Sequence, residues 1–359
     1  PGNLVVPRSQ VGACMSDATV PGRAMRRQVT VRFPGEQVRT TMTPRLADLS
    51  EEELLAVVVP LMRQNRRYAG ELLGPGDDAA VVATSGAVVA TTDTMLRGQD
   101  WRDDWSSGAD VGHKLVAQNL ADLAAMGAVG TGLLVTLAAD PQTELAWVRD
   151  LAQGIGAACA RWAVPVVGGD ICGAASGVVV VGATALGDLA GGAPVLRSGA
   201  RAGDLLALAG GLGRSDAGLQ LLAAGRLQRH PEAVAWHRRP EPPLAAGVDA
   251  RRAGATSMID ISDGLLRDAH RVARASGVRL DLDRAALDVH AAYLRPALSD
   301  GDAWRAVLAG GEEHSLLASY PPEVALPTGW QVVGAVFEGD GVTVDGEPVA
   351  AAGWDHFRP

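Results

Sequence analysis

The sequence predicts an α/β protein whose two halves are of similar size. Apolar strand-like runs alternate with segments of helical periodicity along most of the chain, which is typical of this class. A Gly-Gly-Ala-Pro segment at 191–194 separates two such series and indicates a linker. With 47% hydrophobic and 20% charged residues, the 359-residue chain has the composition of a globular protein with a core. We therefore expect one α/β domain over 44–192 and a second over 193–359.

The first 43 residues differ from the rest of the chain. Residues 1–43 carry scattered proline, glycine and arginine without sustained periodicity, so we expect a disordered tail or an upstream extension from a misplaced start. A targeting peptide is a weaker alternative, because the segment has no compact apolar h-region. A helix is expected to follow over 50–66, where Ser50 and Glu53 have the spacing of a capping box.

The remaining elements follow in order. In the first half we predict strands over 81–83, 87–92, 132–137, 165–168 and 177–186, and helices over 110–126 and 144–163. A turn at Ser85 and Gly86 joins the first two strands. In the second half we predict strands over 204–209, 257–261 and 278–282, a helix from about 215 and a helix over 264–276. No internal repeat is strong enough to indicate duplication.

Charge and cysteine content exclude several classes of function. The formal net charge is −9 and no dense Lys/Arg run occurs, so neither nucleic acid nor an anionic membrane is an expected partner. Cys14, Cys159 and Cys172 form no CxxC pair, which argues against zinc and a disulfide scaffold and predicts reduced thiols in a cytoplasm. No apolar run reaches the roughly 18 residues that a membrane span needs.

Several catalytic signatures are missing from the sequence. Lys114 is the only lysine in the chain, and its surroundings match neither the Gly-Lys-Ser/Thr of a P-loop nor the lysine motif of a protein kinase. The seven histidines form no His-Glu-x-x-His pattern, and no Gly-x-Ser-x-Gly elbow occurs. A kinase of this sequence must therefore be of another type.

Acidic residues beside glycines or near expected strand ends are the most informative feature. They are Asp77, Asp78, Asp93, Asp122, Asp170, Asp260, Asp263, Glu312 and Glu313. Each alone has a structural explanation: an aspartate after glycine is often a turn residue, Asp263 suits a helix N-cap, and Asp122 could lie on a solvated helix face. Together they predict a Mg²⁺ site, because Mg²⁺ prefers oxygen ligands and bridges carboxylates to phosphate oxygens. Several ions would neutralise a nucleoside triphosphate where lysines are missing.

Two further segments suit a phosphate group. Arg197 lies in Leu-Arg-Ser-Gly-Ala, where a guanidinium could bind phosphate oxygens bidentately. Residues 210–215, Gly-Gly-Leu-Gly-Arg-Ser, follow a predicted strand and open a helix, which is typical of a nucleotide-binding turn. The segment is not a dinucleotide fingerprint, because Asp216 stands where Gly-x-Gly-x-x-Gly requires glycine.

An ordered set of motifs over residues 44–359 resembles the thiamine-monophosphate kinase family. The motifs are Gly-Pro-Gly-Asp-Asp-Ala-Ala-Val (74–81), Thr-Thr-Asp-Thr-Met-Leu (91–96), Lys-Leu-Val-Ala-Gln-Asn-Leu-Ala-Asp-Leu-Ala-Ala-Met-Gly-Ala (114–128), Gly-Gly-Asp (168–170), Arg-Ser-Gly-Ala (197–200), Ile-Asp-Ile-Ser-Asp-Gly-Leu (259–265), Gly-Gly-Glu-Glu (310–313) and Gly-Trp-Asp-His-Phe (353–357). The resemblance implies ATP- and Mg²⁺-dependent phosphorylation of thiamine monophosphate to thiamine diphosphate by direct transfer, without a phosphoenzyme. It also implies the fold of aminoimidazole ribonucleotide synthetase and selenophosphate synthetase. In that fold the N-terminal domain binds ATP and Mg²⁺, and its sheet pairs with a second copy in a homodimer.

The resemblance also assigns roles to individual residues. The implied magnesium ligands are Asp78, Thr91, Thr92, Asp93, Asp122, Asp170, Asp260 and Asp263. The implied ATP contacts are Gly169, Asp170, Arg197 and Ser262, and the implied contacts to the thiamine substrate are Asp100, Glu312 and Trp354. In the last group, carboxylates can bind an aminopyrimidine, and an aromatic face suits a cationic thiazolium.

Some positions depart from the family pattern. The family commonly has histidine where Asp100 stands, and Gly-Glu-Asp-Tyr-Glu-Leu where this chain has Gly-Glu-Glu-His-Ser-Leu, so His314 and Ser315 change the rim of the substrate site. Ile171 and Cys172 replace the usual threonine after Gly-Gly-Asp, and Arg214 replaces an aspartate. None of these changes removes an implied metal ligand.

Two alternatives stay open at this point. One is another ATP-dependent enzyme of the same superfamily with a different acceptor, although the motifs at 310–313 and 353–357 favour the thiamine kinase. Selenophosphate synthetase would also need a reactive cysteine, and Cys14 lies in the tail. The other is a non-catalytic module that binds a divalent cation or a nucleotide without turnover. The intact set of acids argues against it, because clustered charges are costly.

Overall fold

The computed structural model describes residues 43–64, 66, 68–75 and 79–355. Except for Thr43, the tail predicted over 1–43 lies outside these residues, so its disorder stays a prediction. The same holds for the predicted magnesium ligand Asp78 and for Asp77.

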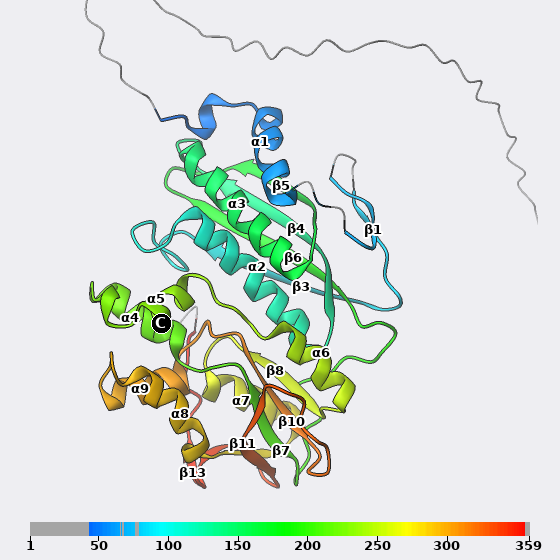
Figure 1. Ribbon diagram of the computed structural model, residues 1–359, viewed down its shortest axis with the longest axis vertical. Helices are drawn as coiled ribbons and strands as arrows, with labels where there is room; N and C mark the ends of the chain where they lie inside the picture. Colours follow the sequence, from blue (N-terminus) through cyan, green and yellow to red (C-terminus); the bar gives the residue numbers. More distant parts are fainter. Residues whose placement is uncertain (1–42, 65, 67, 76–78, 356–359) are drawn as a thin grey trace, which may run out of the picture. The chain divides into compact units, whose positions relative to one another are not determined.

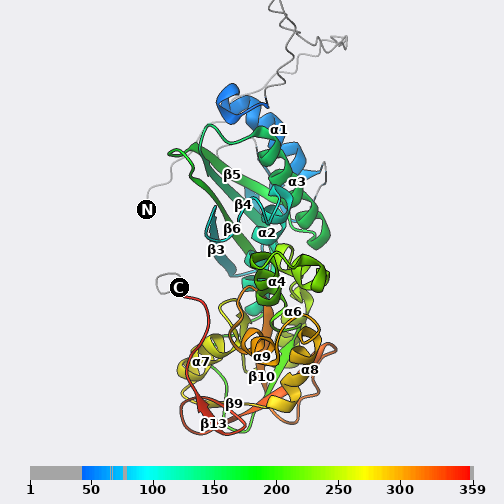
Figure 2. The same cartoon turned by 90° about the vertical axis from the view of Figure 1, so that its left-hand side faces the viewer.

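The first half is built on a four-stranded sheet with the order β3-β6-β4-β5. Its strands are β3 (Val88–Leu96), β4 (Val129–Ala139), β5 (Val166–Gly173) and β6 (Val179–Asp188). The helices α1 (Glu51–Arg63), α2 (Gly108–Ala125) and α3 (Leu145–Trp162) lie on one face of this sheet (Figure 2). A small separate sheet pairs β1 (Glu71–Leu73) with β2 (Val81–Val82). The apolar faces of α2 and α3 and the inner face of the four-stranded sheet form one buried core.

Helix α2 starts sharply and packs closely against α3. Ser107 accepts a hydrogen bond from the backbone N–H of Asp110, and the Asp110 carboxylate accepts one from Ser107, which completes a capping box. Gly112 faces α3, where an added Cβ would lie 2.4 Å from the carbonyl oxygen of Leu151. Only glycine permits this approach, so the position of α2 is set by backbone contact.

The second half contains a seven-stranded sheet with the order β13-β12-β9-β11-β7-β10-β8. Its strands are β7 (Leu205–Ala209), β8 (Ser257–Ile261), β9 (Arg279–Leu282), β10 (Ser315–Tyr320), β11 (Trp330–Phe337), β12 (Gly341–Val344) and β13 (Glu347–Val349). The helices are α4 (Arg214–Ala223), α5 (Pro231–Arg238), α6 (Leu244–Ala253), α7 (Leu265–Ser276), α8 (Arg284–Leu294) and α9 (Asp300–Ala309), with short 3₁₀ turns at Leu46–Asp48 and Leu227–Arg229 (Figure 1). A second buried core lies between this sheet and helices including α7 and α9.

The α/β class predicted from the sequence is confirmed, and so are most of the predicted elements. The strand 257–261 has the predicted bounds, and the Ser50–Glu53 capping box is present. The first helix ends at Arg63 rather than 66, because Gln64 adopts a left-handed conformation with φ 48°. No element was predicted beyond residue 282, so α8, α9 and the strands after them were not expected. The domain boundary at 192/193 stays a prediction.

Two aspartates do not lie where the sequence analysis expected them. Asp93 and Asp170 were expected at strand ends, but both lie inside longer strands, β3 and β5. The glycines at 168 and 169 suggested a strand end, yet an added Cβ at Gly169 would lie 2.0 Å from the carbonyl oxygen of Val135. Glycine there permits close strand pairing. The predicted strand at 81–83 also pairs with β1, while β3 pairs with β6.

Among the described residues, no helix combines the length and the apolar character that crossing a membrane requires.

Candidate functional site

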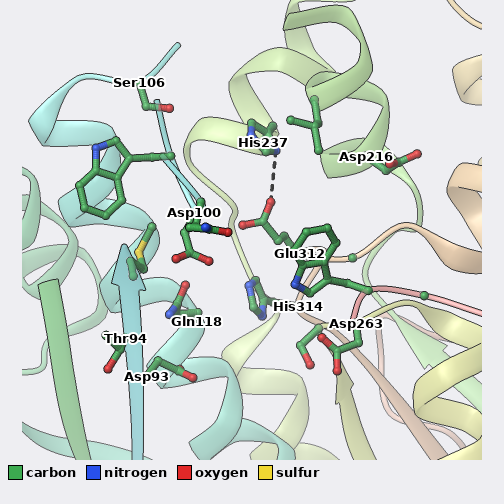
Figure 3. Close-up of a pocket in the computed structure, with 18 of the residues that line it drawn as sticks. Asp93, Thr94, Asp100, Ser106, Gln118, Asp216, His237, Asp263, Glu312 and His314 are labelled. Atoms are coloured by element: carbon green, nitrogen blue, oxygen red, sulfur yellow. Dashed lines mark ion pairs between the residues drawn. The ribbon is translucent and has the colours of Figure 1, made fainter. Parts of the chain in front are cut away.

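A pocket of about 730 Å³ lies between α2 and β3 of the first half and the loops that follow β8 and α9 in the second half (Figure 3). Eight of the residues predicted to bind metal, ATP or substrate line it: Asp93, Asp100, Asp122, Asp260, Ser262, Asp263, Glu312 and Trp354. Thus the fold brings residues from both halves of the chain to one cavity.

Three carboxylates form what we call the aspartate group: Asp93 on β3, Asp122 on α2 and Asp260 on β8. Burial, followed by the charges of Asp260 and Asp93, raises the pKa of Asp122 to about 7. Burial is also the main cause that raises the pKa of Asp93. Thr91, which precedes Asp93 by two residues, donates a 2.5 Å hydrogen bond to Asp122 Oδ2. The three charges therefore disfavour one another, as expected for a group that binds a cation.

His314 lies beside the aspartate group from the loop after α9. Its Nδ1 is 3.4 Å from Asp260 Oδ2, and its ring is buried. Burial lowers the pKa of His314, but the hydrogen bond and charge of Asp260 outweigh it and raise the pKa overall. The backbone is held by a 2.8 Å hydrogen bond from the His314 N–H to Ile261 O. His314 was predicted at the rim of the substrate site, and the structure places it inside the pocket.

Glu312 forms the opposite wall of the pocket. Its Oε1 lies 2.5 Å from Lys114 Nζ, and its Oε2 lies 3.4 Å from His237 Nδ1 (Figure 3). Burial opposes ionisation, but Lys114 and then His237 outweigh it and lower the pKa of Glu312 to about 2. A backbone hydrogen bond of 2.7 Å from the Glu312 N–H to Ser262 O fixes the loop, where Glu312 has φ 58°. Glu312 is thus a fixed anion facing the cavity.

The other two residues predicted to contact the thiamine substrate also line the pocket. The Trp354 residue is 45% exposed, so it is not part of the hydrophobic core. Its backbone N–H donates a 2.8 Å hydrogen bond to Asp263 O, which holds the C-terminal segment over the pocket. Asp100 accepts a 2.6 Å hydrogen bond from the Leu96 N–H through Oδ2, so this oxygen closes the turn after β3.

Asp263 lines the pocket but is engaged by arginines of α7. Its Oδ2 lies 2.5 Å from Arg271 and 3.7 Å from Arg267. A neighbour, Asp268, accepts hydrogen bonds from the N–H groups of Ser262 and Asp263, both 3.1 Å long. Asp263 is not the N-cap of α7, since the capping position is Gly264, with φ 120°. A metal ion at Asp263 would have to compete with the two guanidinium groups.

The structure places other predicted residues elsewhere. Gly169 and Asp170 line a second hollow of about 910 Å³ over the outer face of the four-stranded sheet. Thr92 faces the same side, because successive strand residues alternate between faces, and its Oγ1 accepts a 3.1 Å hydrogen bond from Thr184 of that hollow. Arg197 is exposed and lines neither cavity. The predicted ligands and ATP contacts that line a cavity are therefore divided between two cavities.

The donor set of the aspartate group fits a hard cation. Carboxylate oxygens and the nearby Thr91 hydroxyl are the ligand types that Mg²⁺ prefers. In the part of the chain that the structure describes, however, no three His, Cys, Asp or Glu side chains stand close enough to hold an ion by themselves. Water and phosphate oxygens commonly complete such sites.

Three residues of the site were not predicted from the sequence: Lys114, His237 and Asp268. Lys114 had a usable signal, because a single lysine within a strongly apolar helix indicates a buried partner. Asp268 follows Ile-Ser-Asp-Gly and lies in the first turn of α7, where it caps backbone N–H groups. His237 carried no local signal in the sequence.

Comparison with known proteins identifies the family of this chain. Residues 76–189 match the family model described as AIR synthase related protein, N-terminal domain. A thiamine-monophosphate kinase of Mycobacterium tuberculosis (strain CDC 1551 / Oshkosh) is 44% identical over 322 residues, covering 88% of this chain and 94% of that relative. The crystal structure of thiamine-monophosphate kinase from Stenotrophomonas maltophilia K279a has a TM-score of 0.73 at 28% identity, covering 83% of this chain and 98% of the other. The structure of AaThiL complexed with AMPPCP and TMP has a TM-score of 0.69 at 28% identity, covering 88% and 100%. This chain belongs to the thiamine-monophosphate kinase family, within the AIR synthase-like fold.

Proposed function

We propose that this chain transfers the γ-phosphoryl group of ATP to thiamine monophosphate and so forms thiamine diphosphate. The observation that carries the proposal is a single pocket in which the aspartate group faces Glu312 and Trp354. The first set suits a metal-bound triphosphate, and the second suits a cationic aromatic acceptor. The named relatives and the AaThiL complex with AMPPCP and TMP support the same activity.

The residues of the pocket have separate tasks in this reaction. Trp354 offers an aromatic face to the thiazolium, and Glu312 offers a fixed carboxylate to the aminopyrimidine. A terminal phosphate oxygen of thiamine monophosphate attacks the γ-phosphorus, the new P–O bond forms, and the bond to the β-phosphate oxygen breaks with ADP leaving. Because the acceptor oxygen is already ionised, the protein need only bring the two phosphates together and offset their charge.

We assign Mg²⁺ to the aspartate group. When bound there, Mg²⁺ neutralises phosphate charge and orients the γ-phosphoryl group. Asp93, Asp122 and Asp260 are supported as ligands by their shared pocket and by the raised pKa of Asp122. The remaining assignments, which rest on the family resemblance, are Asp78, Thr91, Thr92, Asp170 and Asp263.

We further propose that the enzyme works as a homodimer in the cytoplasm. The outer face of the four-stranded sheet carries exposed apolar side chains, including Val88 at 51% and Val129 at 57% exposure. The hollow containing Gly169 and Asp170 lies on this same face. A second copy placed there would cover the apolar residues and enclose that hollow, which gives the predicted ATP contacts Gly169 and Asp170 a protected site. Sedimentation of the purified protein tests this, and a monomer at micromolar concentration contradicts it.

The activity is tested directly with purified protein, ATP, Mg²⁺ and thiamine monophosphate, followed by chromatographic detection of thiamine diphosphate. Unphosphorylated thiamine serves as the matched substrate, and we expect no phosphorylation of it. Turnover of thiamine, or binding of ATP without any formation of thiamine diphosphate, would contradict the proposal.

A further inference from the structure

Lys114 is a buried cation whose charged group points at the wall of the pocket. It lies in α2, and its side chain is only 5% exposed, whereas the Glu312 side chain is 36% exposed. Glu312 lines the pocket, and Lys114 does not. A ligand can therefore reach the carboxylate but not the ammonium group, so any effect of Lys114 on a ligand passes through Glu312.

The ion pair fixes the Glu312 carboxylate in one orientation. Oε1 is taken by Lys114 at 2.5 Å, which leaves Oε2 turned toward His237 and the cavity. His237 contributes little positive charge, because burial and the nearby Lys114 lower its pKa to about 4. Its Nδ1 also lies 3.0 Å from Ser215 Oγ. Of these two neighbours, Lys114 makes the shorter contact with the Glu312 carboxylate and supplies the charge that compensates it.

Helix α2 connects the two ends of the pocket. Lys114 and Asp122 lie on this helix eight residues apart, which corresponds to about 12 Å along its axis. Asp122 belongs to the aspartate group, and Lys114 reaches across to Glu312, which lies 198 residues later in the chain. We call the side of the pocket formed by Glu312 and Trp354 the acceptor wall. One rigid helix thus sets the spacing between the expected phosphoryl donor and this acceptor wall.

We propose that Lys114 is a positioning residue for the acceptor: it holds the Glu312 carboxylate at the distance and orientation that thiamine monophosphate needs. This inference rests on the proposed function, because it takes Glu312 as an acceptor contact. It assigns a role to the single lysine of the chain. Lys114 would act on binding of the acceptor, whereas other residues of the pocket contact ATP or the metal.

Kinetics of Lys114→Met test the role. We expect the KM for thiamine monophosphate to rise roughly 10-fold or more, as for loss of a charged hydrogen bond, while the KM for ATP changes less than about twofold. Arg239→Met is the matched control, because Arg239 also pairs with α2, through Asp110, but is half exposed and lies outside the pocket. Its KM values should change less than about twofold. Equal rises in both KM values for Lys114→Met would overturn the inference.

A double variant keeps the test valid if Lys114→Met folds poorly. Lys114→Met combined with Glu312→Gln removes both charges of the pair, so the buried position of Lys114 and its partner are left without an unpaired charge. If Lys114 acts through Glu312, adding Lys114→Met to Glu312→Gln should raise the KM for thiamine monophosphate less than about twofold further. If the two substitutions instead raise the KM independently, so that their fold-changes multiply in the double variant, Lys114 acts by another route.

A spectroscopic measurement on the wild type needs no turnover. Protein labelled with ¹⁵N-lysine gives one side-chain ammonium signal, because the chain has one lysine. We expect this signal to shift when thiamine monophosphate is added without ATP, and to stay in place when thiamine monophosphate is added to Glu312→Gln. No shift in the wild type contradicts the inference about Lys114. Failure to form thiamine diphosphate in the separate activity assay contradicts the proposed function instead.

Discussion

The two ends of the pocket handle negative charge in opposite ways. In the aspartate group, Asp93, Asp122 and Asp260 lie near one another, and burial with mutual repulsion raises the pKa of Asp122 to about 7. At the acceptor wall, Glu312 is matched by Lys114, and its pKa is lowered to about 2. The negative charge of the carboxylates is thus only partly compensated in the aspartate group, whereas Lys114 compensates the charge of Glu312 at the acceptor wall.

This difference indicates what each end is built to bind. A cluster of mutually repelling carboxylates gains most from a metal cation, so it is costly without one. A carboxylate already neutralised by a lysine gains little from a metal, but it offers a hydrogen-bond acceptor of fixed geometry. Stability and activity measurements on the two ends should therefore respond differently to the same kind of substitution.

The largest effect is expected for Asp93→Asn. The substitution removes a charge from the aspartate group, so kcat should fall by at least ~100-fold, as for loss of a key electrostatic group. The melting temperature of the protein without metal or nucleotide should not fall, because a repulsive charge has gone. Both quantities are measured on one preparation.

Asp188→Asn is the control for this experiment. Asp188 lies on β6 of the same sheet, and its carboxylate accepts hydrogen bonds from the backbone and hydroxyl of Ser85. Its loss should lower the melting temperature and leave kcat per folded molecule unchanged. If Asp93→Asn behaves like Asp188→Asn, Asp93 is a structural residue and the metal assignment is wrong.

A smaller effect is expected at the acceptor wall for Trp354→Ala. Loss of stacking on the thiazolium should cost about 1–2 kcal/mol, which is a rise of roughly 5- to 30-fold in the KM for thiamine monophosphate. The KM for ATP should stay nearly constant. Because Trp354 is 45% exposed, the melting temperature should change little. A variant that unfolds early with both KM values raised would count against direct stacking.

The smallest effect is expected at Glu313, which follows Glu312 in the chain, and it concerns how the stability of the protein depends on pH. Glu313 is fully buried, and burial raises its pKa to about 8, although the N–H of Ser215 and the Arg214 charge act in the other direction. A raised pKa means that the folded protein binds the proton more tightly than the unfolded chain does. The contribution of the Glu313 carboxyl to the free energy of unfolding is therefore complete below pH 4.5 and is lost as the pH rises toward 8. Glu312, with its lowered pKa, contributes in the opposite sense, and its contribution is lost as the pH falls from 4.5 toward 2.

Glu313→Gln tests this contrast, since the neutral amide keeps an acceptor for the Ser215 N–H. Between pH 5 and 8 the melting temperature should fall less steeply for the variant than for the wild type. Glu347→Gln, at an exposed position of β13, should follow the wild-type profile. Parallel profiles for the wild type and Glu313→Gln would show that Glu313 does not titrate in this range.

Local patterns allowed much of the fold to be predicted. The capping box at Ser50 and the strand at 257–261 were predicted correctly, because they depend on residues close together in the chain. Asp170 was misplaced, because a glycine that permits close strand pairing has the same sequence signature as one in a turn. Asp93 was misplaced because β3 continues past it to Leu96. The order of acidic motifs indicated the family, but it did not reveal that Thr92 and Asp170 face away from the aspartate group.

The sequence by itself determined the α/β alternation, the set of acids available for metal and substrate, and the family to which the chain belongs. Only the tertiary structure decided which acids meet and how each is compensated. Periodicity reports the face of an element on which a residue lies, but the distance between faces depends on how the elements pack. The pair between Lys114 and Glu312, 198 residues apart, exists because glycine contacts set the position of α2 and a backbone hydrogen bond holds the Glu312 loop.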